Sequence, residues 1–172
     1  MKRKRLSEKE LVSTLSNIEL VSLDTDGVLT DGGIYYDDIG VEMRKFNVKD
    51  GMGIKLLQSI NITVAIISAS SSPAIRHRAA SLDIEHVYLG EREKLKALKV
   101  IVENLTLTMD KVLHMGDDLN DIPVMERVGC PIAVYDAVDE VIGNAVYVTE
   151  KSGGSGAVRD ICDMIIAAKS GR

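Results

Sequence analysis

The sequence is poor in aromatic residues and in cysteine. Its 172 residues include no Trp, one Phe and five Tyr, and the formal net charge is -5. A nucleic-acid-binding surface needs basic tracks and stacking platforms, so this composition argues against one. The two cysteines, Cys130 and Cys162, lie far apart and in no metal-ligand spacing, which gives no support to a disulfide framework or a zinc site. We expect both to be buried as small apolar side chains.

Long apolar runs are missing too. No stretch approaches the roughly 18 consecutive apolar residues of a membrane helix, and the N-terminus MKRKRLSEKE lacks the apolar core of a secretory signal. We therefore expect a cytoplasmic protein with no membrane partner, in which the basic run Lys2–Arg5 is a solvated tail. The length and the 45% hydrophobic content predict a single domain over residues 1–172.

What the chain does contain is an alternation of short apolar or β-branched runs with helical patterns. This alternation predicts an α/β fold, a doubly wound, Rossmann-like parallel sheet with helices on both faces. Before it, Ser7 and Glu10 form a capping box that predicts a short helix ending near Asn17. Gly33–Phe46 interrupts the alternation as a β-hairpin around a polar turn. The predicted sheet strands are Ile18–Leu23, Ile62–Ser68, Ile84–Leu89, Lys111–Met115, Pro131–Val134 and Ala145–Val148; the hairpin strands are Ile34–Tyr36 and Val41–Phe46; the helices are Gly51–Ile60, Pro73–Leu82, Arg92–Asn104, Leu119–Val128 and Ala157–Lys169.

Two carboxylates follow the first predicted strand at the point where it ends. In an open parallel sheet, ligands bind at the carboxyl ends of the strands. Asp24 and Asp26 stand two apart in extended backbone, so their side chains point to the same side. Like charges this close favour a cation or a shared proton, and Mg²⁺ suits a site of one or two carboxylates. The alternative, that both merely cap a turn before Gly27, stays open on this segment alone.

Three further strand ends carry polar groups. Ser68 ends its strand just before a helix that begins at Pro73, where hydroxyls and helix amides can hold a phosphate, although serines there are often simple caps. Lys94 lies in the first turn of the following helix, where the helix dipole disfavours a cation, so it hints at an anionic ligand; a solvent-facing lysine is the alternative. The last of these strand ends adds a dense acidic group, Gly116-Asp117-Asp118-Leu119-Asn120-Asp121.

Together these groups fit phosphoryl transfer. A carboxylate can attack phosphorus, Mg²⁺ and a lysine can neutralise the oxygens, and a second acid can protonate the leaving alcohol. The sequence therefore favours a magnesium-dependent phosphatase.

The same residues resemble the signatures of the haloacid dehalogenase superfamily. These are Asp-x-Asp-Gly-Val-Leu-Thr-Asp-Gly at Asp24–Gly32, then Ser68, Lys94 and Gly-Asp-Asp-x-x-Asp at Gly116–Asp121. Two more segments, Phe46–Ile54 and Gly153–Asp160, resemble the 3-deoxy-D-manno-octulosonate 8-phosphate phosphatases; the resemblance covers a core of about residues 18–168.

This resemblance implies roles for individual residues. It implies that Asp24 is the nucleophile, Asp26 the general acid and base, Ser68 a phosphate donor and Lys94 the charge neutraliser. Mg²⁺ would be held by Asp24, the Asp26 carbonyl and Asp117, with support from Asp118 and Asp121. It also implies a capless homotetramer with the hairpin serving assembly, and a sugar phosphate bound by Asn47, Val48, Lys49, Asp50, Gly51, Lys55 and Arg78.

Two departures bear on the substrate. The family usually has Gly-Arg where this chain has Ala69-Ser70, and Arg where it has Ser155. Since serine cannot grip an anion bidentately, we expect altered substrate preference more readily than lost chemistry. The leading substrate is 3-deoxy-D-manno-octulosonate 8-phosphate, and a nonulosonate (sialic-acid-type) 9-phosphate is the alternative.

Two readings from other classes stay open. One is a catalytically idle assembly domain related to acylneuraminate cytidylyltransferases, which the two missing arginines favour. The other is a response-regulator receiver, although there the phosphorylated Asp ends a later strand than the acid pair. The histidines His77, His86 and His114 form no ligand spacing, and we predict no role for them.

Overall fold

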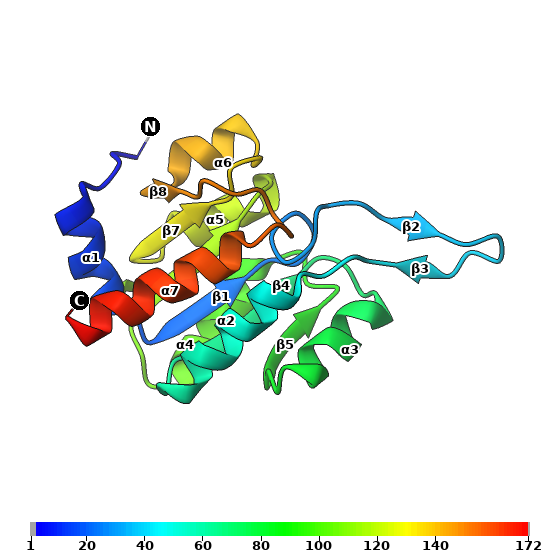
Figure 1. Cartoon of the computed structure of the whole chain (residues 1–172), viewed down its shortest axis with the longest axis horizontal. Coiled ribbons are helices and arrows are strands. Elements are labelled where there is room, and N and C mark those ends of the chain that lie inside the picture. The colour runs from blue at the N-terminus through cyan, green and yellow to red at the C-terminus, as the bar shows by residue number, and fades with distance from the viewer. Residues whose placement is uncertain (1–2, 172) are drawn as a thin grey trace.

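A six-stranded parallel sheet forms the centre of the molecule, as Figure 1 shows for a computed structural model that describes residues 3–171. The strand order is β5-β4-β1-β6-β7-β8, so β1 lies between β4 and β6 near the middle. The Rossmann-like prediction is confirmed. The strands are β1 (Leu20–Leu23), β4 (Thr63–Ser68), β5 (His86–Leu89), β6 (Val112–Gly116), β7 (Cys130–Ala133) and β8 (Tyr147–Val148).

Apolar side chains on both faces of the central strands explain why these segments form the middle of the sheet. In β4, Val64 and Ile66 enter one hydrophobic core, while Ala65 and Ile67 enter the other. This alternation is the two-residue period of a strand, and burial on both sides requires a helical layer over each face.

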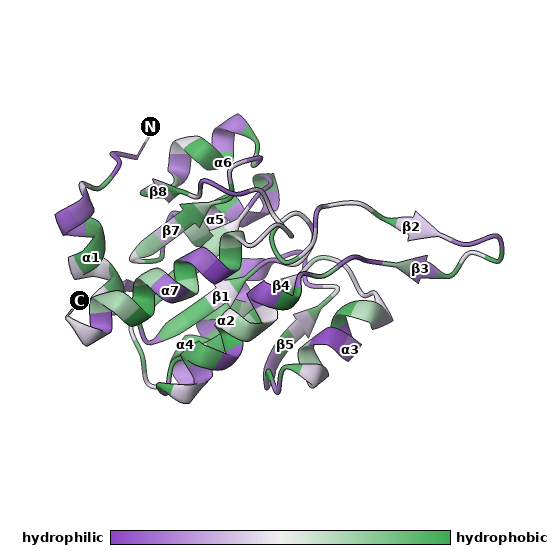
Figure 2. Cartoon of the chain, viewed as in Figure 1, coloured by the Kyte–Doolittle hydropathy of each residue, from purple (hydrophilic) through white to green (hydrophobic). Residues whose placement is uncertain are grey.

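The helices supply those two layers. Helices α1, α2, α3 and α7 contribute to the larger core, with α7 packed against both α1 and α2, and α4 and α5 contribute to the other core. Green and purple segments alternate along α7 in Figure 2, as in an amphipathic helix, and its buried Val158, Ile161 and Ile165 belong to the larger core. The bounds are α1 (Glu8–Ser16), α2 (Val48–Ser59), α3 (Pro73–Ser81), α4 (Lys94–Asn104), α5 (Ile122–Met125), α6 (Asp139–Asn144) and α7 (Ala157–Ser170).

Two helical segments differ from the prediction. The predicted helix Leu119–Val128 is shorter: a 3-10 turn, Leu119–Asp121, precedes α5. Helix α6 was not predicted, because it has six residues, no side-chain cap and an internal glycine, Gly143, so it gives little helical signal.

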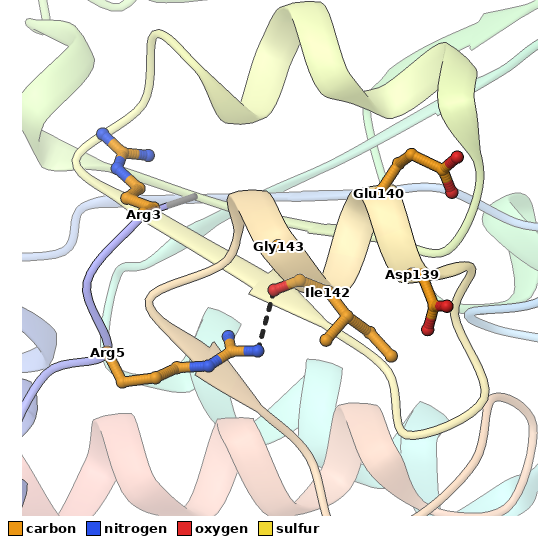
Figure 3. A pocket seen from close by; sticks show the side chains of 6 residues that line it. All are labelled: Arg3, Arg5, Asp139, Glu140, Ile142 and Gly143. Atoms are coloured by element: carbon orange, nitrogen blue, oxygen red, sulfur yellow. Dashed lines mark hydrogen bonds between the residues drawn. The ribbon is translucent and has the colours of Figure 1, made fainter. Parts of the chain in front are cut away.

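The N-terminal segment corrects another expectation. The capping box of Ser7 and Glu10 at the start of α1 is confirmed. The prediction of a solvated basic tail is wrong for Arg3, which is half-buried, whereas Arg5 is exposed but hydrogen-bonded to the fold. Arg3 Nη1 donates to the Met125 carbonyl at 2.6 Å, and Arg5 Nη2 donates to the Ile142 carbonyl at 2.7 Å (Figure 3). Carbonyls in the last turn of a helix have no N–H four residues on within the helix, and they attract cations. This explains the contacts of Arg3 with α5 and of Arg5 with α6. Lys2 lies outside the described residues.

The predicted hairpin is present and projects from the body of the protein (Figure 1). It consists of β2 (Tyr35–Tyr36) paired with β3 (Glu42–Met43), and a bridge between Thr30 and Phe46 closes its base. Its large apolar side chains are exposed, with Ile39 at the tip 86% accessible. Elsewhere, Cys130 and Cys162 are buried and free, as predicted. Among the described helices, none is long and apolar enough to cross a membrane.

Candidate active site

Asp24 lies at the carboxyl end of β1, the central position of the sheet. Its side chain is buried, with 5% of the residue exposed. Oδ1 accepts a hydrogen bond from the Thr25 backbone at 2.7 Å, and Oδ2 lies 2.7 Å from the Lys94 ammonium. The backbone therefore orients one oxygen while a cation faces the other.

Lys94 is the first residue of α4 and is almost fully buried, with 1% exposed. Its ammonium also lies 2.7 Å from Asp121 Oδ1 and donates to Asn120 Oδ1 at 3.2 Å. Burial alone would lower the pKa of Lys94, but Asp24 and Asp121 outweigh burial and raise it. This lysine is therefore a fixed positive charge, and the alternative of a solvent-facing lysine is wrong.

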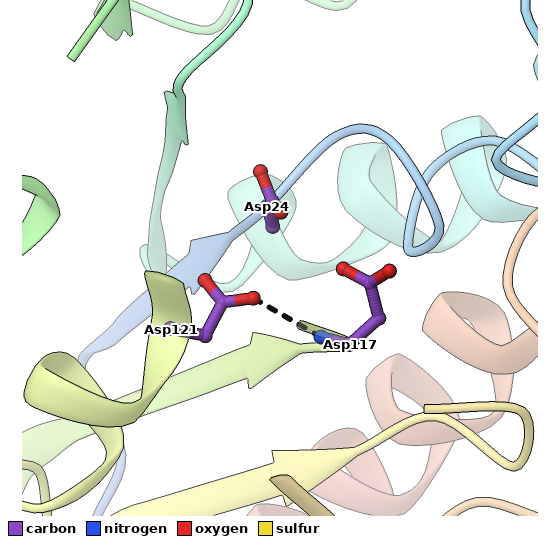
Figure 4. Close-up of side chains that lie close together, drawn as sticks. All are labelled: Asp24, Asp117 and Asp121. Carbon is purple, nitrogen blue, oxygen red and sulfur yellow. Dashed lines mark hydrogen bonds between the residues drawn. The ribbon is translucent and has the colours of Figure 1, made fainter. Parts of the chain in front are cut away.

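Three carboxylates converge beside that ammonium, as Figure 4 shows for Asp24, Asp117 and Asp121. One oxygen of each lies within 4.8 Å of the others. Burial and the charge of Asp121 raise the pKa of Asp24 to about 6, and Lys94 offsets part of this rise. Burial and the charges of Asp24 and Asp121 raise the pKa of Asp117 to about 8. One ammonium is too little charge for three carboxylates, so the group suits a divalent cation.

Asp117 supplies the observation that fits a metal. Its Oδ1 is buried and has no hydrogen-bond partner. Asp117 Oδ2 approaches the backbone of Gly27 so closely that a β-carbon there would lie 2.0 Å from it, and Gly27 has a φ of +85°. Only glycine accommodates both the close approach and this backbone conformation. The position of Gly27 in the signature thus has a direct structural cause.

Asp121 is the hub that holds these groups together. Its Oδ2 accepts from the backbone of Asp117 at 3.1 Å, and its Oδ1 lies 3.0 Å from His114 Nε2. Burial would raise the pKa of Asp121, but the hydrogen bond and charge of His114, together with Lys94, lower it to about 2. Asp121 is therefore the firmly ionised member of the three.

His114, to which we assigned no role, is part of this arrangement. It is fully buried in β6, and its Nδ1 lies 3.1 Å from Ser22 Oγ of β1, its register partner. The available signal was a polar residue inside an otherwise apolar, buried strand. It could have identified His114 as a buried hydrogen-bonding group, although not its partner.

The acidic groups form part of the wall of a pocket of about 230 Å³. Ser68, at the end of β4, also lines the pocket, and Ser68 Oγ accepts a hydrogen bond from the Ser70 backbone at 3.2 Å. Three strand ends, those of β1, β4 and β6, thus meet around one space that could admit a phosphoryl group, and Lys94 contacts Asp24 at its wall. The residues that line it are Asp24, Asp26, Gly32, Ser68, Ala69, Ser70, Asp117, Asp118 and Asn120.

Comparisons with known proteins agree with this geometry. A family model described as haloacid dehalogenase-like hydrolase matches residues 76–161. The 3-deoxy-D-manno-octulosonate 8-phosphate phosphatase of Escherichia coli K12 is 43% identical over 160 residues, which is 93% of this chain and 85% of that protein. The chain belongs to the haloacid dehalogenase-like hydrolases.

Solved structures of other members have the same fold. The 3-deoxy-D-manno-octulosonate 8-phosphate phosphatase of Yersinia pestis is 42% identical and superposes with a TM-score of 0.91, covering 92% of this chain and 86% of that one. The Moraxella catarrhalis phosphatase, solved with magnesium, phosphate and KDO, is 34% identical with a TM-score of 0.93, covering 95% and 94%. The present chain is therefore a phosphatase of this family, and Mg²⁺ is its cofactor.

In this haloacid dehalogenase-like phosphatase the predicted site residues fall into two groups. Asp24, Lys94, Asp117 and Asp121 come together in the acid cluster, with Asp26 and Ser68 on the pocket wall. Asp118 is exposed at the pocket rim, where its side chain accepts from the Leu119 backbone at 2.7 Å.

The second group surrounds the start of α2, away from the pocket lining. Asn47 caps α2 through Lys49 N and donates to the Gly154 carbonyl. Asp50 is buried, and its Oδ1 accepts from the Arg159 backbone at 2.8 Å. The other five predicted residues also lie here. Val48 and Lys49 are exposed, and Lys55 pairs with Asp83. Gly51 makes room for Arg78, whose Nη2 donates to the Asn47 carbonyl.

Proposed function

We propose that this phosphatase acts on 3-deoxy-D-manno-octulosonate 8-phosphate, an acidic keto-deoxy sugar phosphate, through a phospho-aspartate on Asp24. The observation that carries the mechanism is the position of Asp24, at the wall of the pocket with Lys94 at 2.7 Å and Asp117 beside it. The substrate rests on the relatives named above, and they favour the eight-carbon sugar over a nonulosonate 9-phosphate.

The first step forms the phospho-aspartate. A carboxylate oxygen of Asp24 attacks phosphorus, the bond from phosphorus to the sugar oxygen breaks, and Asp26 gives its proton to that oxygen. In the second step Asp26 takes a proton from water, the water oxygen attacks phosphorus, and the acyl phosphate bond breaks. Inorganic phosphate leaves and Asp24 returns to its starting state.

The charges around the pocket support these steps. The Lys94 ammonium offsets the negative charge of the transferring group, and the Ser68 hydroxyl can donate to a phosphoryl oxygen. Asp24, Asp117 and the carbonyl of Asp26 would hold Mg²⁺. The bound cation supplies positive charge that keeps the carboxylates ionised and neutralises the phosphoryl oxygens.

For the sugar, we propose contacts with the residues around the start of α2. The exposed Val48 and Lys49 are free to meet a ligand directly. Asn47, Asp50 and Arg78 are engaged by backbone groups, so their contribution is to hold the shape of this surface.

We also propose that the protein assembles as a homotetramer through the hairpin Gly33–Phe46. A protruding two-stranded sheet with exposed Ile34, Tyr36, Ile39 and Val41 has no core of its own to bury these side chains. Contact with other copies would cover them.

Phosphate release tests the proposed function. The purified protein is assayed with Mg²⁺ on 3-deoxy-D-manno-octulosonate 8-phosphate, a nonulosonate 9-phosphate and simple sugar phosphates. We expect the highest kcat/KM on the first, and a loss of at least about 10³-fold in Asp24→Asn. Hydroxylamine trapping should detect the acyl phosphate in the wild type and not in that variant. No release from any ester would refute the proposal and support the idle assembly domain.

A further inference from the structure

Arg44, just after β3 of the hairpin, reaches back to the general acid. Its Nε donates to Asp26 Oδ1 at 2.6 Å and its Nη2 donates to Asp26 Oδ2 at 3.1 Å. The same Nη2 donates to Ser70 Oγ at 3.0 Å, and Nη1 pairs with Glu42. The guanidinium therefore grips both oxygens of one carboxylate and is itself held by a second carboxylate and a hydroxyl.

The location of Arg44 separates it from the groups that meet substrate. Asp26 and Ser70 line the pocket, whereas Arg44 is not among the described residues that do. Only 2% of its side chain is exposed, against 30% for Asp26. All three nitrogens of this buried guanidinium are engaged by protein groups, so we expect it to act through Asp26 and Ser70 and not by touching the substrate.

The two carboxylates of the signature are thus fixed by different means. Asp24 is held by burial, by the Thr25 backbone and by Lys94. Among the described contacts, the side chain of Asp26 has its partner in Arg44 alone. Without the hydrogen bonds from Arg44, the partly exposed carboxylate of Asp26 could change rotamer.

Ser70 links Arg44 to Ser68, another residue that lines the pocket. Ser70 N donates to Ser68 Oγ at 3.2 Å, and Ser70 Oγ accepts from both Arg44 and the Ser72 backbone. One guanidinium consequently connects the loop that carries Asp26 with the loop that follows Ser68. Serine at position 70 suits this arrangement, because an arginine there would bring a second cation against Arg44.

We propose that Arg44 is a positioning residue that orients Asp26 toward the leaving oxygen and so couples the hairpin to the chemistry. The inference rests on the proposed function, in which Asp26 protonates that oxygen. It predicts a slower first step, the formation of the phospho-aspartate, only for esters whose leaving oxygen needs a proton. An alkyl sugar phosphate needs it, whereas p-nitrophenyl phosphate, whose leaving group is a weak base, does not.

Arg44→Ala and Arg44→Lys test the proposal, with Lys45→Ala as the matched control at a neighbouring basic residue whose ammonium pairs with Asp31. In Arg44→Ala we expect the single-turnover rate of phospho-aspartate formation from the alkyl ester to fall about tenfold to a hundredfold, with KM little changed. The same rate from p-nitrophenyl phosphate, followed as the burst of p-nitrophenol, should stay within about threefold of wild type. Arg44→Lys should recover part of the loss, because an ammonium can meet one oxygen of the pair. Lys45→Ala should behave as wild type.

A double-mutant cycle separates positioning from structural damage. When Asp26→Asn has already removed the acid, adding Arg44→Ala should change the single-turnover rate on the alkyl ester by less than about threefold. Equal losses in this single-turnover rate on both esters, or a full further loss in the Asp26→Asn background, would overturn the inference and leave the proposed function standing. An effect on KM only would make Arg44 a substrate contact and overturn it as well. A wild type inactive on both esters would overturn the proposed function and this inference together.

Discussion

The acid cluster and the hairpin are held in opposite ways. The acid cluster of Asp24, Lys94, Asp117 and Asp121 comes from the ends of β1 and β6, from α4 and from the turn after β6. Short polar contacts join most of its members, and His114 of β6 binds Asp121. The hairpin has two paired residues in each strand and exposes its apolar side chains. The members of the cluster thus have their partners within one chain, whereas the apolar side chains of the hairpin stay exposed. Arg44, just after β3, connects the hairpin to Asp26 beside the cluster.

Removing the hub of the cluster should have the largest effect on stability. Asp121→Ala leaves His114 Nε2, the Asp117 backbone and part of the Lys94 ammonium without a buried partner. Breaking a buried ion pair from one side costs about 3–5 kcal/mol. We expect a loss of this size in the free energy of unfolding, measured by urea denaturation near neutral pH.

Asp118→Ala is the matched control for that experiment. Asp118 is exposed and caps the Leu119 backbone, so its loss should cost ~1 kcal/mol. If both variants lost a similar free energy of unfolding, the buried contacts of Asp121 would contribute no more to stability than the exposed cap of Asp118.

Magnesium should reverse the pH dependence that the cluster imposes. Without metal, the raised pKa of Asp117, about 8, means that the folded state binds more protons than the unfolded state above pH ~4. Stability from this group is therefore full at low pH and is lost as pH rises through about 8. Mg²⁺ competes with those protons, so its stabilising effect should grow from pH 6 to pH 8. At a hundredfold excess over Kd we expect about 2.7 kcal/mol, or roughly 5–10 °C in Tm.

Asp117→Asn should lose most of this response and be more stable than wild type in chelator at pH 8. Asp38→Asn, which changes an exposed acid of the hairpin, serves as the control and should respond as wild type does. If Mg²⁺ raised the Tm of Asp117→Asn as much as that of wild type, Asp117 would not be a ligand.

The sheet and most of the site could be predicted because their signals are local. Apolar runs gave strands, and polar residues just after Leu23, Ile67 and Met115 meet because parallel strands end at one edge. Lys94 was found the same way, since a cation at a helix start needs an anionic neighbour.

The contacts that were missed are long-range. Arg44 meets Asp26 across 18 positions of sequence, and nothing in the hairpin pattern indicates where its side chain turns. Arg3 meets carbonyls more than a hundred residues away. His114 depends on strand register, which sets Ser22 beside it. Such pairs are decided by tertiary packing, whereas periodicity reports only which face of an element is apolar.

The smallest effect on a single chain should come from the tip of the hairpin. Ile39→Asp alters a side chain that is 86% exposed, so we expect the free energy of unfolding of a dissociated chain to change by no more than about 0.5 kcal/mol. If copies assemble through the hairpin, the same change places a charge in an apolar contact and should lower the molar mass measured by light scattering. Val100→Asp, at an exposed apolar position of α4, is the control and should leave the molar mass unchanged. If both variants lost assembly, or neither did, the hairpin would not be the interface. The proposed contrast, between a cluster stabilised within one chain and a hairpin covered by other copies, would then be wrong.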